Sequence, residues 1–311
     1  MKLLRSAILL LVGLISTNGH SFGQYIFTTV NDPLGTNGSQ VTGVSGNNLA
    51  GFYFDSDNTP HGFMYDGSTF TTLDVPSADL TFAYGISGDT VAGYSYSGGG
   101  PTGFTYNGGT YTPVSVPLAD NGTQVFGISG SSFVGAYASG LSQHGFVYDG
   151  STYTQLDVPG GAFTTATGIS GGNIAGFYIG EDDANHGFLY DGSTYTTLDD
   201  PLANNVANQG TMIFGISGNN IVGNYYDVDG ITHGFLYDGS TWTTIDNPLG
   251  VGGTSIFGAD GTTLVGTYTD INGVSNGFTA TTTPEPSSFA LLGLGLCGLG
   301  WVTYRRSKLS A

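Results

Sequence analysis

A repeat with a period near 42 residues fills most of this chain and limits what it can fold into. A Gly-Phe pair recurs at spacings of 41, 42, 42, 47 and 43 residues, starting at Gly62, Gly103, Gly145, Gly187, Gly234 and Gly277. A second mark, Gly-Ile-Ser-Gly or a close variant, also occurs six times, and the segment from Gly215 to Gly250 represents one copy. A fixed period of this length is typical of solenoids and propellers, in which one supersecondary unit is repeated.

Each copy predicts four short antiparallel strands. In the copy that contains Gly215, these are residues 212–217, 221–226, 233–237 and 241–245, which are rich in Tyr, Phe, Ile, Val and Thr. Turn residues separate them, and the pair Asp238-Gly239 predicts a tight two-residue hairpin. Four such strands in about 40–45 residues are the signature of a propeller blade.

The two ends of the repeat region complement each other. The last copy stops after its third strand, at Ala280. Residues 27–35 match the fourth-strand segment 242–250. We therefore predict an all-β, six-bladed propeller of four-stranded blades in which the N-terminal strand closes the last blade, so that no edge is exposed. An open β-solenoid with caps is the alternative fold.

The charge distribution excludes one class of partner. Of the 23 acidic residues, 22 lie within residues 24–283, whereas all five Lys and Arg residues lie outside this segment. Without basic side chains to neutralise phosphates, the repeat region is not expected to bind nucleic acid. It cannot form Lys or Arg salt bridges, so apolar burial and backbone pairing must hold the fold.

Both termini predict export. Residues 1–23 combine Lys2 and Arg5 with a short apolar run and a small-residue cleavage site, which is typical of a signal peptide; a membrane anchor is the weaker alternative. Near the other end, residues 289–304 are apolar, and Arg305 and Arg306 follow. As a helix this run would be about 24 Å long, a short transmembrane-type helix that would hold the chain in the membrane before processing.

The C-terminal segment 284–311 resembles the PEP-CTERM sorting signal of Gram-negative bacteria. Its Pro284, Glu285 and Pro286 match the motif that gives the signal its name, ahead of the apolar run and the basic end. The resemblance implies recognition by an exosortase-type membrane protease and delivery to the cell surface or to an exopolysaccharide matrix. A plain C-terminal anchor is the alternative. Cys297 lies in the apolar run, where a buried thiol is favoured over a lipidation site.

The repeats resemble the HAF family of bacterial extracellular repeats. The shared pattern is Gly-Ile-Ser, His-Gly-Phe, Tyr-Asp-Gly and Thr-x-Leu-Asp-x-Pro, and it covers about 240 residues. This resemblance implies an extracellular location and no particular activity. The chain departs from the pattern where Thr102 and Asn276 replace the histidine.

Loop lengths distinguish the two faces of the predicted ring. The turns after the first strands have constant length, whereas the loops on the opposite rim vary, and the longest carries an insertion at residues 202–211. Variable loops on a constant scaffold usually carry recognition. We therefore take this second rim as the candidate binding face, with seven acidic candidate residues: Asp55, Asp57, Asp182, Asp183, Asp227, Asp229 and Asp270.

Two of these residues also suggest a metal. Asp227 and Asp229, in an Asp-x-Asp-Gly turn, could bind Ca²⁺ through their oxygens, but the later ligands of a full calcium loop are missing. Simple turn chemistry is the alternative. Four histidines recur at one repeat position, and a repeated structural hydrogen bond explains them better than zinc does; they are His61, His144, His186 and His233.

These features favour a binding or structural module over an enzyme. Carboxylates are abundant, but no catalytic set stands out from the repeat, and no Lys or Arg is available to stabilise an oxyanion. Tyr, Asn and Asp side chains suit contacts with a neutral glycan or exopolysaccharide. The alternative is a secreted propeller enzyme acting on polysaccharide, of the glycosidase or lyase type.

Overall fold

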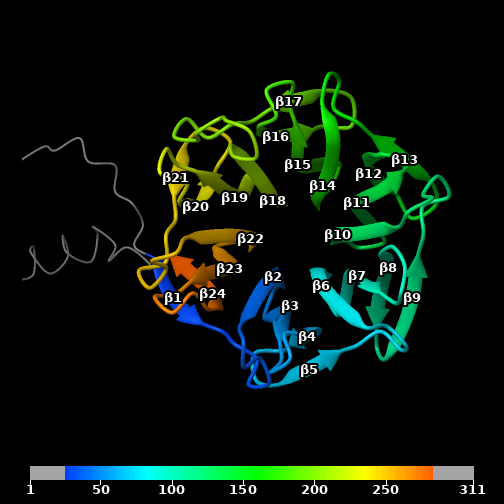
Figure 1. Cartoon of the computed structure of the whole chain (residues 1–311), viewed down its shortest axis with the longest axis vertical. Helices are drawn as coiled ribbons and strands as arrows, with labels where there is room; N and C mark the ends of the chain where they lie inside the picture. Colours follow the sequence, from blue (N-terminus) through cyan, green and yellow to red (C-terminus); the bar gives the residue numbers. More distant parts are fainter. Residues whose placement is uncertain (1–24, 283–311) are drawn as a thin grey trace, which may run out of the picture. The chain divides into compact units, whose positions relative to one another are not determined.

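The computed structural model describes residues 25–282, which form twenty-four β-strands. These strands make six four-stranded antiparallel sheets, placed as blades around a central axis (Figure 1). The six-bladed propeller with four-stranded blades is therefore confirmed. In each blade the first strand lies nearest the axis and the fourth lies outermost (Figure 1).

The blades are numbered from the first complete one. Blade one holds β2 (Ser39–Ser45), β3 (Asn48–Phe54), β4 (Pro60–Tyr65) and β5 (Phe70–Leu73). Blade two holds β6 (Leu80–Ser87), β7 (Thr90–Tyr96), β8 (Thr102–Asn107) and β9 (Thr110–Val114). Blade three holds β10 (Thr123–Ser129), β11 (Ser132–Ser139), β12 (Ser142–Tyr148) and β13 (Tyr153–Leu156). Blade four holds β14 (Ala162–Ser170), β15 (Asn173–Ile179), β16 (Asn185–Tyr190) and β17 (Tyr195–Thr197). Blade five holds β18 (Thr211–Ser217), β19 (Asn220–Tyr226), β20 (Thr232–Tyr237) and β21 (Trp242–Thr244). Blade six holds β22 (Thr254–Asp260), β23 (Thr263–Thr269) and β24 (Ser275–Thr282), and β1 (Tyr25–Thr29) is its outer strand.

The N-terminal strand closes the ring as predicted. The Val30 amide donates to the Gly277 carbonyl at 2.8 Å, and the Asn31 side chain accepts from the Gly277 amide at 3.0 Å. The Phe27 ring lies 5.4 Å from that of Phe278. Because β1 and β24 come from opposite ends of the repeat region, this sheet fastens the ring.

The core of each blade is a phenylalanine packed on a glycine of the neighbouring strand. In blade five, Gly223 of β19 pairs with Phe235 of β20, and a methyl group added to Gly223 would lie 2.9 Å from the Phe235 ring. It would also collide with the carbonyl oxygen of Met212 on β18. The same pair recurs around the ring, with these phenylalanines buried: Phe63, Phe104, Phe146, Phe188, Phe235 and Phe278.

Neighbouring blades are joined near the axis by a repeated set of polar contacts. Each inner strand has a bulge before the glycine of Gly-Ile-Ser, as at Val41–Gly43 in β2. The bulged Thr42 donates its hydroxyl to the Ala83 carbonyl of the next blade at 2.9 Å. Further along β2, the Ser45 hydroxyl accepts from the Gly88 amide at 3.0 Å. The Gly-Ile-Ser motif therefore fixes one blade against the next.

The turns between third and fourth strands differ in detail from the predicted Asp-Gly hairpin. In blade one, the Asp66 carboxylate accepts hydrogen bonds from the amides of Ser68 and Thr69, each at 2.8 Å. Gly67 has a φ of 92°, whereas Asp66 is not left-handed. The turn is therefore centred on Gly67 and Ser68, and Asp66 caps it as a side-chain acceptor, because a short carboxylate reaches the amides that follow it.

Some predicted segments lie outside the described residues. These are the signal peptide, residues 1–23, and the C-terminal segment 284–311 with its transmembrane-type helix. Within residues 25–282, no helix has the length and apolar character needed to cross a membrane.

The glycine contact in the blade core can be tested by substitution. We expect Gly223→Ala to lower the free energy of unfolding by roughly 1–3 kcal/mol, because the methyl group meets both the Phe235 ring and the Met212 carbonyl. Gly172→Ala is the matched control, since a methyl group there has no neighbour within 4 Å. Thermal unfolding followed by circular dichroism measures both; equal stability of the two variants would contradict this account of the core.

Candidate functional site

The structure places the seven predicted acidic residues in turns between second and third strands. Asp55 and Asp57 lie between β3 and β4, and the others lie in the equivalent turns of blades four, five and six. Since strands alternate in direction, these turns share one rim with the loops that enter each blade. We call this face the second rim.

The first aspartate of each turn holds the turn together. Asp227 Oδ1 accepts hydrogen bonds from the amides of Asp229 and Ile231, at 2.9 and 2.8 Å. Asp55 and Asp270 make the same pair of bonds in their own turns. Backbone hydrogen bonding, led by the Ile231 amide, lowers the pKa of Asp227. These carboxylates are therefore charged turn caps.

The four recurring histidines form clamps with aspartates. In blade four, His186 Nδ1 lies 2.7 Å from Asp199 and Nε2 lies 3.1 Å from Asp182. His61 and His233 are held in the same way by two aspartates each. Each clamped ring also lies against a tyrosine of the second strand, as His186 does against Tyr178, with centroids 5.5 Å apart. The repeated histidine therefore connects three strands of its blade to the rim turn.

Burial lowers the pKa of His186, but hydrogen bonds to Asp199 and Asp182 outweigh it and leave the pKa raised. The same balance, with Asp246 and Asp227 as partners, raises the pKa of His233. In turn, the hydrogen bond to His186 is the main cause that lowers the pKa of Asp182.

The blades that lack the histidine replace the clamp with other groups. In blade six, Asn31 donates to Asn276 at 2.8 Å, so an amide pair occupies the position of the His–Asp pair. In blade two, Thr102 stands at the histidine position and Ser115 at the aspartate position. The aspartate and the histidine are thus lost together, as expected if they serve each other.

The calcium candidates are largely used by the protein itself. Asp227 Oδ1 accepts two backbone amides, and its Oδ2 lies 3.3 Å from His233 Nε2. Asp229 lies on the exposed side of the same turn. Within residues 25–282, no three His, Cys, Asp or Glu side chains are grouped so as to hold a metal ion.

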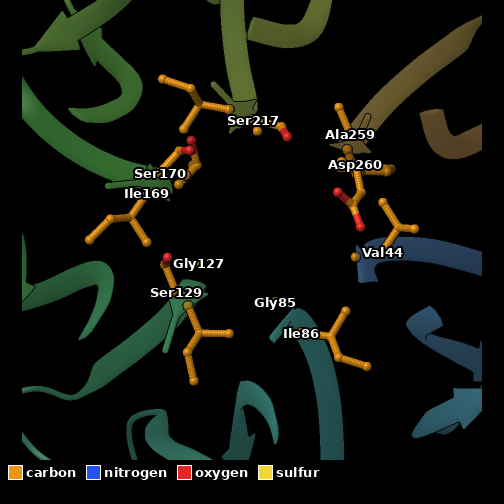
Figure 2. Close-up of a pocket in the computed structure, with 18 of the residues that line it drawn as sticks. Val44, Gly85, Ile86, Gly127, Ser129, Ile169, Ser170, Ser217, Ala259 and Asp260 are labelled. Atoms are coloured by element: carbon orange, nitrogen blue, oxygen red, sulfur yellow. The ribbon is translucent and has the colours of Figure 1, made fainter. Parts of the chain in front are cut away.

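A polar mouth opens at the axis on the opposite face, where the first strand of each blade turns into the second. Its cavity of about 200 Å³ is lined by the Gly-Ile-Ser segments of the inner strands (Figure 2). Asp260 replaces the serine of the motif in blade six, and Figure 2 shows it beside Ser217 at this mouth. Its Oδ2 accepts from the Gly46 amide at 2.7 Å, which continues the inter-blade contacts. One carboxylate does not supply the pair that glycoside hydrolysis requires.

Along the axis, the bulged residues line an apolar cavity of about 130 Å³. They include Tyr84, Phe126, Phe214 and Phe257. Phe126 belongs to an aromatic cluster with Tyr84 and Tyr94, whose rings lie 5.1 and 5.8 Å from it. Burial raises the pKa of both tyrosines. The alternation of side chains between the two faces of each inner strand did not predict this cavity, because each bulge shifts one residue out of that register.

A third cavity, of about 240 Å³, lies on the second rim between blades three and four. Its walls include His144 and Asp157 of blade three and Phe163 of blade four. Phe163 is 46% exposed and has a φ of 51°, a backbone conformation that is uncommon for an aromatic residue. The repeat pattern does not predict this pocket, although the sequence carries one signal of it: Phe163 stands where four other blades have glycine.

Comparison with known proteins identifies the C-terminal segment. Residues 282–306 match the model of the PEP-CTERM protein-sorting motif, which confirms that part of the predicted tail. The motif is a recognition signal for exosortase, so the chain carries a signal for export and sorting to the bacterial surface. The search of curated proteins finds no match to the chain.

Solved structures similar to the ring support the propeller fold. The SapL1 lectin in complex with alpha methyl fucoside is 12% identical, with a TM-score of 0.54 over 82% of this chain and 99% of the lectin. Putative TolB from Agrobacterium tumefaciens is 16% identical, with a TM-score of 0.50 over 79% of this chain and 90% of its own. The β-propeller domain of the Trilobed protease from Pyrococcus furiosus is 10% identical, with a TM-score of 0.50 over 78% of each chain. At such identities the likeness concerns the fold alone.

The His186 clamp makes stability depend on pH. A histidine whose pKa is raised on folding contributes stability below its unfolded value of 6.5 and loses it as pH rises through the folded pKa. Asp182, whose pKa is lowered, contributes stability above 3.8 and loses it as pH falls through its folded pKa. The clamp is therefore most stabilising between these two values.

We expect His186→Gln to lower the melting temperature more at about pH 5.5 than at about pH 8.5, because only the lower pH charges the wild-type ring. Thermal unfolding at both pH values measures this difference. Thr102→Ser, at the position where blade two has no histidine, is the control and should show no such dependence. An equal loss at both pH values would mean that the clamp acts through packing alone.

Calcium binding at Asp227 and Asp229 is tested by unfolding with EDTA and with millimolar Ca²⁺. Because the Asp227 oxygens already have protein partners, we expect no stabilisation beyond that of Mg²⁺ at matched ionic strength. A Ca²⁺-specific rise in melting temperature that Asp227→Asn abolishes would instead establish a calcium site in this turn.

Proposed function

We propose that the protein is an exported binding module of the surface or exopolysaccharide matrix of a Gram-negative bacterium, and that its second rim binds neutral glycans. In this proposal residues 1–23 are removed as a signal peptide, and residues 24–283 form an extracellular ring of HAF-type repeats. The segment 284–311 holds the chain in the membrane through its apolar helix until exosortase acts on Pro284, Glu285 and Pro286.

The observation that carries the proposal is the combination of a sorting signal with a ring that presents no Lys or Arg side chain. The motif at residues 282–306 directs the chain to the surface. The ring itself contains 22 acidic residues and no Lys or Arg. Anionic polymers are therefore repelled, whereas uncharged polysaccharides meet hydroxyl, amide and aromatic groups without an electrostatic barrier.

The rim has the physical character that neutral sugars require. Its turns are held rigid by Asp55, Asp227 and Asp270, so ordering them on binding costs little entropy. The proposed contact face comprises the seven rim residues Asp55, Asp57, Asp182, Asp183, Asp227, Asp229 and Asp270, together with the loops that enter each blade. A lectin that binds a methyl fucoside uses the same fold, so a propeller is a suitable scaffold for such contacts, although fold alone does not define function.

Binding to immobilised polysaccharides tests this function. We expect the purified protein to be retained by neutral polysaccharides, and retention should persist in high salt because it does not depend on ion pairing. Polyuronates and sulfated polysaccharides should not retain it at low salt. A boiled sample of the same protein is the control for non-specific adhesion. Retention by anionic but not neutral polymers would overturn the proposal.

A further inference from the structure

On the second rim, most joints between neighbouring blades are closed by direct backbone contact at a glycine. This glycine precedes the first Ser or Thr of the inner strand in four blades and always has left-handed φ. In blade three, a methyl group on Gly122 would lie 2.5 Å from the ring of Pro101 in blade two. In blade one, a methyl group on Gly38 would lie 2.7 Å from the Ser275 carbonyl of blade six. The backbones therefore touch at these joints and leave no room for a side chain.

Blades two and four depart from this pattern, with Leu80 in blade two and Phe163 in blade four. A benzyl group cannot occupy the space that the glycine fills elsewhere, and its ring is 46% exposed. Phe163 keeps a left-handed φ of 51° without the freedom of glycine, which stores strain in the backbone. The 240 Å³ cavity between blades three and four lies at this unsealed joint, with Phe163 in its wall.

The histidine at this joint also departs from the pattern of the ring. His144 Nδ1 lies 3.0 Å from Asp157, as in the other clamps. Its Nε2, however, has no hydrogen-bond partner among the residues the structure describes, because the turn between β11 and β12 is short and brings no aspartate to it. In the tautomer that donates from Nδ1 to Asp157, the imidazole has a lone pair at Nε2 that can accept a hydrogen bond, and His144 lies in the cavity wall.

The surrounding groups hold this acceptor and its carboxylate partner in place. Gln155 donates to Asp157 at 2.6 Å, so the carboxylate is held within the clamp. Gln143 donates to Thr165 of blade four at 2.6 Å, which leaves its amide oxygen as a second acceptor. The pocket thus combines one apolar ring with acceptors that need hydroxyl donors.

We propose that this pocket binds one uncharged pyranose ring, with an apolar sugar face against Phe163 and a hydroxyl donated to His144 Nε2. Alternating C–H faces and hydroxyl edges match an aromatic wall beside neutral acceptors. The cavity is below the roughly 300–1,000 Å³ of sites for larger ligands, which suits a terminal sugar residue rather than the interior of a chain. The inference rests on the proposed function and assigns it to one place on the second rim.

The test uses Phe163→Gly, which places at this joint the residue that four of the other five blades have. Methyl α-fucoside, methyl β-galactoside and methyl β-glucoside serve as probes in saturation-transfer NMR and titration calorimetry. We expect wild type to bind at least one of them and Phe163→Gly to weaken that binding by about tenfold or more. Its melting temperature should equal or exceed that of wild type, because glycine relieves the left-handed backbone.

Two further variants make the result specific. His144→Asn, the residue of blade six, should weaken binding of the same glycoside, whereas Leu141→Ala should not. Leu141 lies in the neighbouring turn, is 97% exposed and does not line the cavity.

The possible failures are distinguishable. If neutral polysaccharides retain the protein but Phe163→Gly binds the glycoside as tightly as wild type, this pocket is wrong and the proposed function stands. If neither polysaccharide nor glycoside binds to the wild type, both proposals fail.

Discussion

The contact between a phenylalanine ring and a cross-strand glycine is the interaction on which each blade depends. It occurs in all six blades, and each phenylalanine is buried. Burying such a ring contributes about 1.5–3 kcal/mol, and glycine lets the neighbouring strand lie directly beneath it. The propeller contains no Lys or Arg, so histidine is the residue that forms ion pairs with aspartate, as in the Asp182–His186–Asp199 clamp. Apolar burial and hydrogen bonding must therefore overcome the repulsion among 22 acidic groups.

Features encoded within one repeat could be predicted from the sequence because each was present several times. The closing strand followed from the match between residues 27–35 and 242–250, and the acidic turns could be assigned to one rim from strand direction alone. Contacts between repeats could not be predicted in this way. The bond from the Gly88 amide to Ser45, for example, joins residues 43 positions apart whose meeting depends on the inter-blade angle. In the sequence, each recurring histidine is followed 13 residues later by an aspartate, as His61 is by Asp74. That the two side chains pair could not be predicted, because it depends on the third strand lying beside the end of the fourth.

The candidate pocket was harder to predict because it arises from departures from the repeat. Phe163 in place of glycine and a β11–β12 turn without aspartate each resemble ordinary variation, since blade two also lacks both the glycine and the aspartate. Their significance appears only when β12 and β14 are seen to meet at one joint. Asp260 is also a departure from the repeat, because it stands where other blades have serine. It keeps the inter-blade hydrogen bond of that serine, so its role is structural.

The acidity of the ring and the proposed recognition of neutral sugars are compatible because they act over different distances. The aspartates that cap the turns, such as the exposed Asp66 and the half-buried Asp227, carry charges whose field decays within about 8 Å at physiological salt. That field keeps anionic polymers and other copies of the ring apart. At the joint between blades three and four, the Asp157 carboxylate is already hydrogen-bonded by His144 and Gln155, and His144 Nε2 is the acceptor proposed for a sugar hydroxyl group. The acidity of the ring therefore does not conflict with the proposed binding of a sugar at the joint where Phe163 replaces glycine.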